Sequence, residues 1–111
     1  MERDYKLFIK DIVESISLVE NYILNVTEEN FYKDSKLQDA VIRRLEIIGE
    51  AASRIPRAVK QKNPQINWNS IVEYRNFIVH SYFDASMRRI WQVAKLELNE
   101  LKVNLSRLSL L

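Results

Sequence analysis

The sequence predicts an all-α fold: a single domain over residues 1–111, built as an antiparallel four-helix bundle with a short extra helical turn. The chain has 111 residues but only one Gly and two Pro, and so few chain-breaking residues favour long helices over strands and hairpins. Apolar residues recur at steps of three and four along most of the sequence, which is the spacing of one face of an amphipathic helix. A chain of this length has room for one modest core.

The first two predicted helices each carry one apolar stripe. The first spans about residues 3–25, and the stretch "NVTEENFYKDS" after it interrupts the period and predicts a loop. Asp34 or Ser35 can cap the second helix, which should end before Pro56. The stripes are Tyr5, Phe8, Ile9, Ile12, Ile16, Val19 and Ile23 in the first helix, and Leu37, Val41, Leu45, Ile48, Ala52 and Ile55 in the second.

The third and fourth predicted helices follow the connector "IPRAVKQKNPQIN", which has room for one short helical turn. Asn67 is a typical N-cap residue, so we expect the third helix to begin near Trp68 and to end near His80. Asp84 or Ser86 should cap the last helix. The inward positions are Ile71, Tyr74 and Ile78 in the third helix, and Met87, Ile90, Ala94, Leu98, Leu101, Leu105 and Leu108 in the last.

The second and fourth helices also carry apolar residues outside these stripes. They are Ile42, Ile47, Trp91, Val93, Leu96 and Val103. One chain of this size has little surface with which to cover them, so they predict self-association, most simply as a two-fold homodimer. The alternative is that they are isolated apolar residues on the surface, which are common in monomers.

Composition narrows the functional classes. The absence of Cys excludes disulfides and thiolate metal sites and fits a reducing, cytoplasmic location. The N-terminus, "MERDYKLFIKDIVES", has charges where a signal peptide would be apolar, and no run approaches the roughly 18 apolar residues of a membrane span. One His and no clustered Asp or Glu offer no metal site, and we expect no cofactor. A net charge of +2 permits contact with RNA without arguing for it.

The stretch "RNFIVHSYFD" gathers the residues most suited to chemistry: Arg75, Asn76, the only histidine, His80, and Tyr82. Asn76 and His80 are four residues apart and share a helix face, but Arg75 and His80 lie about 140° apart around an ideal helix. Either the helix loosens near Val79, or the arginine and histidine that cooperate come from two chains across a two-fold axis. The sequence leaves both open.

These side chains suit the cleavage of RNA phosphodiesters. The His80 imidazole can take or give a proton near neutral pH. The Arg75 guanidinium can bind phosphate oxygens in a forked geometry and stabilise the charge of the transition state. The Asn76 amide can orient the substrate by hydrogen bonding. No metal ion is needed for this chemistry, because the ribose 2′-hydroxyl is an internal nucleophile.

Three further features invite a structural interpretation. Gly49 lies within the second helix and costs it about 1 kcal/mol relative to alanine, which predicts close approach of another helix. Glu46 and Glu50 are four residues apart; they are either an acid/base pair or partners of nearby arginines. Arg88 and Arg89 open the last helix, where cations oppose the helix dipole; Asp84, RNA or a protein partner could compensate for them.

The sequence resembles the HepT-like toxins, a branch of the HEPN superfamily. "RNFIVHSYF" matches the R-x4-H-x-Y pattern of these proteins, "IRRLEIIGEAASRIP" is similar to their second helix, and "NPQINWNSIVEYRNFIVHSYF" and "IWQVAKLELNEL" to their later segments. The resemblance covers most of the chain, from Asp4 to Leu101. It implies a homodimeric helical fold in which the arginines and histidines of both chains line one cleft.

The resemblance also implies a function. The protein would be the metal-independent endoribonuclease toxin of a type VII toxin–antitoxin system, with Arg75 and His80 as catalytic residues and Asn76 orienting the substrate. Its antitoxin would be an MntA-type minimal nucleotidyltransferase, which would neutralise it by AMPylation of Tyr82. The competing interpretation is a non-catalytic helical dimer that binds nucleotide or RNA as a partner module of a nucleotidyltransferase. A third is a purely structural bundle.

Overall fold

A computed structural model of the chain describes residues 4–77 and 85–108, and within those ranges every regular element is a helix. The all-α fold class is therefore confirmed. The elements are α1 (Tyr5–Tyr22), α2 (Glu28–Lys33), α3 (Ser35–Ser53), α4 (Arg57–Lys62), α5 (Trp68–Val72), the 3₁₀ turn η1 (Glu73–Asn76), α7 (Ala85–Gln92), the π-helical segment η2 (Val93–Glu97) and α8 (Leu98–Ser106).

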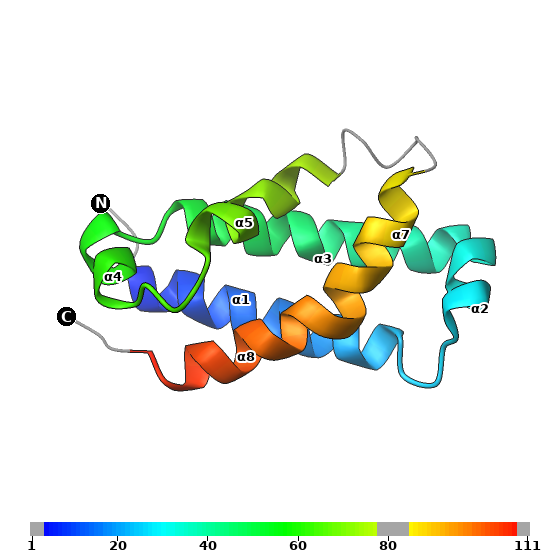
Figure 1. Cartoon of the computed structure of the whole chain (residues 1–111), viewed down its shortest axis with the longest axis horizontal. Coiled ribbons are helices and arrows are strands. Elements are labelled where there is room, and N and C mark those ends of the chain that lie inside the picture. Colours follow the sequence, from blue (N-terminus) through cyan, green and yellow to red (C-terminus); the bar gives the residue numbers. More distant parts are fainter. Residues whose placement is uncertain (1–3, 78–84, 109–111) are drawn as a thin grey trace.

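The long helices reverse direction from one to the next (Figure 1). Helices α1 and α3 lie side by side and antiparallel, and they form the largest contact in the molecule. Helix α5 and the turn η1 run back over α3, while α7, η2 and α8 form one long segment that returns along α1. The turn that carries Arg75 therefore rests on the middle of α3.

The predicted apolar stripes form the core. Most of their described members are buried, and the others pack against the core at its edge. The fully buried side chains include Ile12, Ile16 and Val19 of α1, Val41, Leu45 and Ile48 of α3, and Ile90 and Leu98 of the last segment. Ile78 lies outside the described residues.

Part of the apolar excess that predicts a dimer is covered within one chain. Ile42, Trp91 and Val93 are buried in the subunit itself, and the Trp91 ring packs against Phe31 of α2, with the ring centroids 5.2 Å apart. Leu96 and Val103 remain 66% and 43% exposed. The argument from uncovered surface thus rests on fewer residues than the sequence suggests, and the homodimer stays a prediction.

Two of the predicted helix caps are confirmed, and one predicted loop is wrong. The Asp34 side chain accepts the backbone N–H of Leu37 at 3.0 Å, and Asn67 accepts that of Ser70 at 3.2 Å. The stretch expected to be a loop contains α2, whose N-terminus is capped by Thr27. This helix is held in place by Phe31, its one buried residue, whose aromatic ring has no exposed surface.

The third predicted helix begins at Trp68 as expected but is interrupted by a 3₁₀ turn. Helix α5 ends at Val72, the chain continues as the turn η1 through Asn76, and Phe77 is again α-helical. A 3₁₀ turn is wound more tightly than an α-helix and is common at helix ends. Here it turns Tyr74 inward, where only 3% of its surface is exposed. His80 lies outside the described residues. So do Val79, the point at which one of the two arrangements loosens the helix, and Asp84, one of the two candidate caps.

Within the described ranges, no helix combines the length and apolar character that a membrane span requires.

Candidate active site

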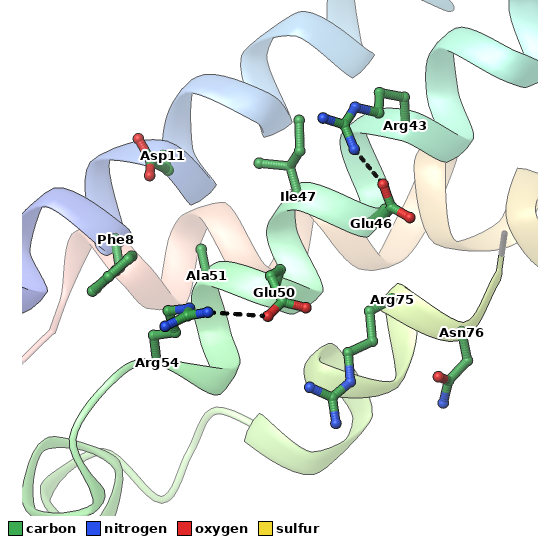
Figure 2. A pocket seen from close by; sticks show the side chains of 10 residues that line it. All are labelled: Phe8, Asp11, Arg43, Glu46, Ile47, Glu50, Ala51, Arg54, Arg75 and Asn76. Atoms are coloured by element: carbon green, nitrogen blue, oxygen red, sulfur yellow. Dashed lines mark hydrogen bonds and ion pairs between the residues drawn. The ribbon is translucent and has the colours of Figure 1, made fainter.

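A groove of about 690 Å³ opens between α1, α3 and the turn η1 (Figure 2). It contains two of the four predicted site residues, Arg75 and Asn76, both exposed. Its other lining residues are Phe8 and Asp11 of α1, Arg43, Glu46, Ile47, Glu50 and Ala51 of α3, and Arg54 just after it. The sequence does not indicate that α1 contributes to the site, and of α3 it singles out only Glu46 and Glu50, in one of the two interpretations of their spacing.

The charges in this groove are mostly paired. Arg43 forms an ion pair with Glu46, and the Arg54 guanidinium lies 3.8 Å from the Glu50 carboxylate (Figure 2). Glu46 and Glu50 are therefore salt-bridged, which was one of the two interpretations of their spacing. Of the three groove arginines, Arg75 alone has no ion pair within the described part of the chain. Its guanidinium is thus available to an anionic ligand.

The backbone of Arg75 is held against α3 at Gly49. A Cβ atom at position 49 would lie 2.6 Å from the Arg75 backbone nitrogen, 3.0 Å from the Val72 carbonyl oxygen and 3.1 Å from that of Ile71. Atoms do not approach so closely without overlap, so only glycine fits. This confirms the packing interpretation of Gly49, and it shows that the segment approaching it is the turn that carries the candidate site.

Asn76 follows Arg75 on the same turn. Its side-chain amide donates a hydrogen bond to the Glu73 carboxylate at 2.6 Å. This contact fixes the amide nitrogen and leaves the side-chain carbonyl oxygen as an acceptor toward the groove. His80 and Tyr82, the remaining predicted site residues, lie outside the described residues.

Sequence reasoning misses a polar network behind the turn. The Tyr74 hydroxyl donates to Oε1 of Glu97 at 3.0 Å, and Arg89 donates to both oxygens of the same carboxylate, to Oε1 at 3.1 Å. Arg89 therefore finds a counter-charge in Glu97 of the same chain, a partner that the sequence did not suggest. The residues are too far apart in sequence for any local pattern to pair them with Tyr74.

This network perturbs its members in a consistent direction. Burial, together with the neighbouring Glu97 carboxylate, raises the pKa of Tyr74 well above its usual range. The hydrogen bond to Glu97 raises the pKa of Arg89. The phenol therefore stays protonated and can donate to Glu97 throughout the neutral and alkaline range in which proteins function.

In residues 4–77 and 85–108, no three His, Cys, Asp or Glu side chains come together as a metal ion would need. The groove cations instead suit a ligand that carries its own negative charge, such as a phosphodiester.

Comparisons with known proteins agree with this chemistry. The family described as "Ribonuclease HepT-like" matches residues 12–108. A Thermococcus cleftensis protein named "Probable ribonuclease HepT" is 38% identical over 108 residues, which are 97% of this chain and 98% of that protein. A Methanocaldococcus jannaschii protein named "Gamma-glutamylcyclotransferase and putative RNase MJ0434" is 39% identical over 102 residues, or 92% of this chain. The chain spans only 46% of the length of this second relative. No solved structure matches significantly.

The described elements are all helical, and Arg75 of the R-x4-H-x-Y stretch has no ion pair among the described residues; with the comparisons, this places the chain among the HEPN-like ribonucleases. The chain belongs to the HepT-like ribonuclease family. The resemblance predicted from its motifs is confirmed, and with it the class of enzyme, an endoribonuclease.

Proposed function

We propose that this ribonuclease is the toxin of a type VII, HepT/MntA-like toxin–antitoxin system, and that it cuts RNA phosphodiesters without a metal ion. The observation that carries the proposal is the exposed Arg75 guanidinium, which has no ion pair among the described residues while Arg43 and Arg54 beside it are neutralised. An arginine without an ion pair among the described residues, beside two arginines that have one, can form a charge-assisted hydrogen bond with a phosphate.

The chemistry divides between the proposed site residues. His80 removes the proton of the ribose 2′-hydroxyl, and the 2′-oxygen attacks the adjacent phosphorus. The bond from phosphorus to the 5′-oxygen breaks, and that oxygen leaves with the proton that the protonated His80 returns. Arg75 stabilises the negative charge that develops on the phosphoryl oxygens. Asn76 accepts a hydrogen bond from the substrate through its carbonyl oxygen. The products are a 2′,3′-cyclic phosphate and a 5′-hydroxyl end.

The site is composite in this proposal: Arg75 of one chain acts with His80 of a second copy across a two-fold axis. The angular argument supports this arrangement, because residues five apart point about 140° apart on a regular α-helix and about 120° apart on a 3₁₀ helix, the form that η1 takes at Arg75. The exposed apolar side chains of Leu96 and Val103 are available to a partner copy. Two such chains would place two arginines and two histidines around one groove.

The simplest test incubates the wild-type protein with single-stranded RNA in the presence of EDTA. We expect cleavage, with fragments that end in 2′,3′-cyclic phosphate, because the internal nucleophile and the protein side chains suffice. Mass spectrometry of the fragments identifies these ends. RNA that is bound but left intact would favour the rival function, a non-catalytic dimer that binds RNA or nucleotide. Loss of cleavage on chelation would contradict the metal-free mechanism.

Regulation in this proposal acts on Tyr82. A cognate nucleotidyltransferase antitoxin, MntA-like, transfers AMP from ATP to the Tyr82 hydroxyl, and pyrophosphate leaves. The modification adds negative charge and bulk near Arg75, and both compete with RNA.

Co-expression with the cognate nucleotidyltransferase should raise the intact mass of the wild-type chain by whole AMP units. Tyr82→Phe, which lacks only the acceptor oxygen, should keep its unmodified mass under the same conditions. Growth arrest on expression of the toxin alone, relieved by the antitoxin, is the matching result in cells. An unmodified wild-type chain would rule out this mode of control.

A further inference from the structure

We propose that Glu97 is a positioning residue of the ribonuclease site, which holds Tyr74 and thereby fixes the turn that presents Arg75 to the groove. This inference rests on the proposed function, because it assigns Arg75 a role in cleavage. Glu97 itself does not line the groove that contains Arg75.

The contact between Glu97 and the turn is direct. Tyr74 immediately precedes Arg75 in the 3₁₀ turn, and its buried ring points away from the groove into the core. Its hydroxyl reaches Oε1 of Glu97 at 3.0 Å. Below the turn, the Tyr74 ring stacks on Phe77, with the ring centroids 5.6 Å apart. Since adjacent residues share a peptide unit, movement of Tyr74 must move Arg75.

Arg89 fixes Glu97 in turn. Two guanidinium nitrogens donate to the two oxygens of the Glu97 carboxylate, and such a forked pair defines the orientation of both groups. Oε1 therefore accepts from Tyr74 and Arg89 at once. A carboxylate that is held at both oxygens is a more rigid support than an exposed, freely rotating one.

The π-helical segment explains how Arg89 and Glu97 meet. Residues eight apart on a regular α-helix lie about 80° apart around its axis, too far round for a forked pair. The π-helical segment Val93–Glu97 follows Arg89 and ends at Glu97. It accommodates more residues per turn than an α-helix, which brings the Arg89 and Glu97 side chains closer to one face. A π segment of this kind is uncommon and often accompanies a functional site.

The turn η1 is thus held in place by contacts on two sides. On one side Gly49 of α3 packs against the Arg75 backbone nitrogen so closely that no Cβ atom would fit between them. On the other side Glu97 holds the Tyr74 hydroxyl. Together these contacts leave Arg75 with a fixed backbone and a free side chain, which is what a preorganised phosphate-binding group requires.

Two conservative substitutions test the inference in the full chain. Tyr74→Phe removes only the hydroxyl and keeps the ring in the core, and Glu97→Gln removes the charge that pairs with Arg89. We expect each to lower kcat for RNA cleavage by about 10- to 100-fold, because a small displacement of a catalytic group is costly. The KM should change little, since most of the substrate surface is unaffected.

Glu20→Gln is the matched control. Glu20 pairs with Lys102 of α8 at 3.0 Å, and the two side chains are 40% and 47% exposed, close to the 33% and 41% of Glu97 and Arg89. This pair joins α8 to α1, and neither of its side chains lines the groove that contains Arg75. Glu20→Gln should leave kcat within about twofold of wild type, because an isolated surface ion pair contributes little.

Two readouts separate positioning from general stability. In an Arg75→Lys background, Tyr74→Phe should have much less effect on kcat than in the wild type, because both changes act through one group. Independently of activity, the NMR amide signals of Arg75 and Asn76 should shift in Tyr74→Phe and stay in place in Glu20→Gln.

Unchanged amide signals in Tyr74→Phe, or kcat within about twofold of wild type in both variants, would overturn the positioning role. Wild-type protein that does not cut RNA would overturn the proposed function instead. In that case the NMR comparison would still decide whether Glu97 holds the turn.

Discussion

Alanine in place of Arg75 is expected to lower kcat for RNA cleavage by about 100- to 1000-fold, the usual loss when one preorganised charge-stabilising group is removed. The fold should tolerate the change. Arg75 is exposed and forms no ion pair with another described residue, so its side chain contributes little to stability. Cleavage rates and thermal melting of the same preparation measure both effects.

Arg107→Ala is the control for the loss of charge alone. Arg107 is also exposed and follows α8, and its removal lowers the net charge by the same amount. A general electrostatic role of positive charge in RNA binding would make both variants weaker to a similar degree and salt-dependent. A catalytic role affects Arg75→Ala alone. Comparable activity of the two variants would remove Arg75 from the mechanism.

His80→Ala should lower kcat by about 100- to 10,000-fold, because it removes the proposed general base. Since no other histidine exists in the chain, nothing of similar pKa can replace it. Cleavage that survives in this variant would discredit the acid/base assignment of His80.

Gly49→Ala is expected to destabilise the protein, although the same change in most helices stabilises it. Alanine favours the helical backbone by about 1 kcal/mol over glycine. Here the added methyl group would lie 2.6 Å from the backbone nitrogen of Arg75 and 3.0 Å from a carbonyl oxygen of the same segment. Backbone atoms cannot rotate away as a flexible side chain can, so overpacking of about 1–3 kcal/mol outweighs the gain.

We therefore expect a lower free energy of unfolding, by up to about 2 kcal/mol on these opposing magnitudes, and a reduced kcat, because the turn must move away from α3. Denaturant unfolding and cleavage rates are the measurements. Asp39→Ala, at an exposed position of the same helix, changes helix propensity without this contact and should not destabilise. A Gly49→Ala protein as stable and as active as wild type would mean that the close approach does not matter.

The sequence predicts the helical core well because the buried residues of a helix recur every three or four positions in the sequence. The stripe from Ile12 to Val19 and the stripe of α3 are buried as expected. The spacing of apolar residues does not reveal helix α2, because this helix has one buried residue, Phe31, and no apolar stripe. Its start was visible in principle: Thr27 is a good N-cap, and Glu28 and Glu29 follow it in the first turn.

The π-helical segment η2 cannot be recognised from the spacing of its apolar residues. Successive steps of four between Ile90, Ala94 and Leu98 fit a wider turn, but the same steps occur in α3, which is regular. The spacing of apolar residues therefore cannot distinguish the two. The contact between Tyr74 and Glu97 joins residues 23 positions apart, and only the tertiary fold brings them together.

For the site, the sequence identifies the chemistry and omits its surroundings. The motif gives Arg75 and Asn76, which both line the groove. It gives no sign that Phe8 of α1 and Ile47 of α3 belong to the groove wall, because both look like ordinary apolar residues of a helix. Their position is decided by how α1, α3 and η1 pack, which is a property of the whole fold.

The composite site is the central claim, and mixing two inactive variants tests it most directly. Arg75→Ala and His80→Ala proteins are unfolded together, refolded and assayed for RNA cleavage beside each variant alone. If Arg75 of one chain acts with His80 of its partner, each mixed dimer holds one intact site, and random pairing should restore about a quarter of wild-type activity. A mixture no more active than the separate variants would show that both groups act from one chain, or that no such dimer forms.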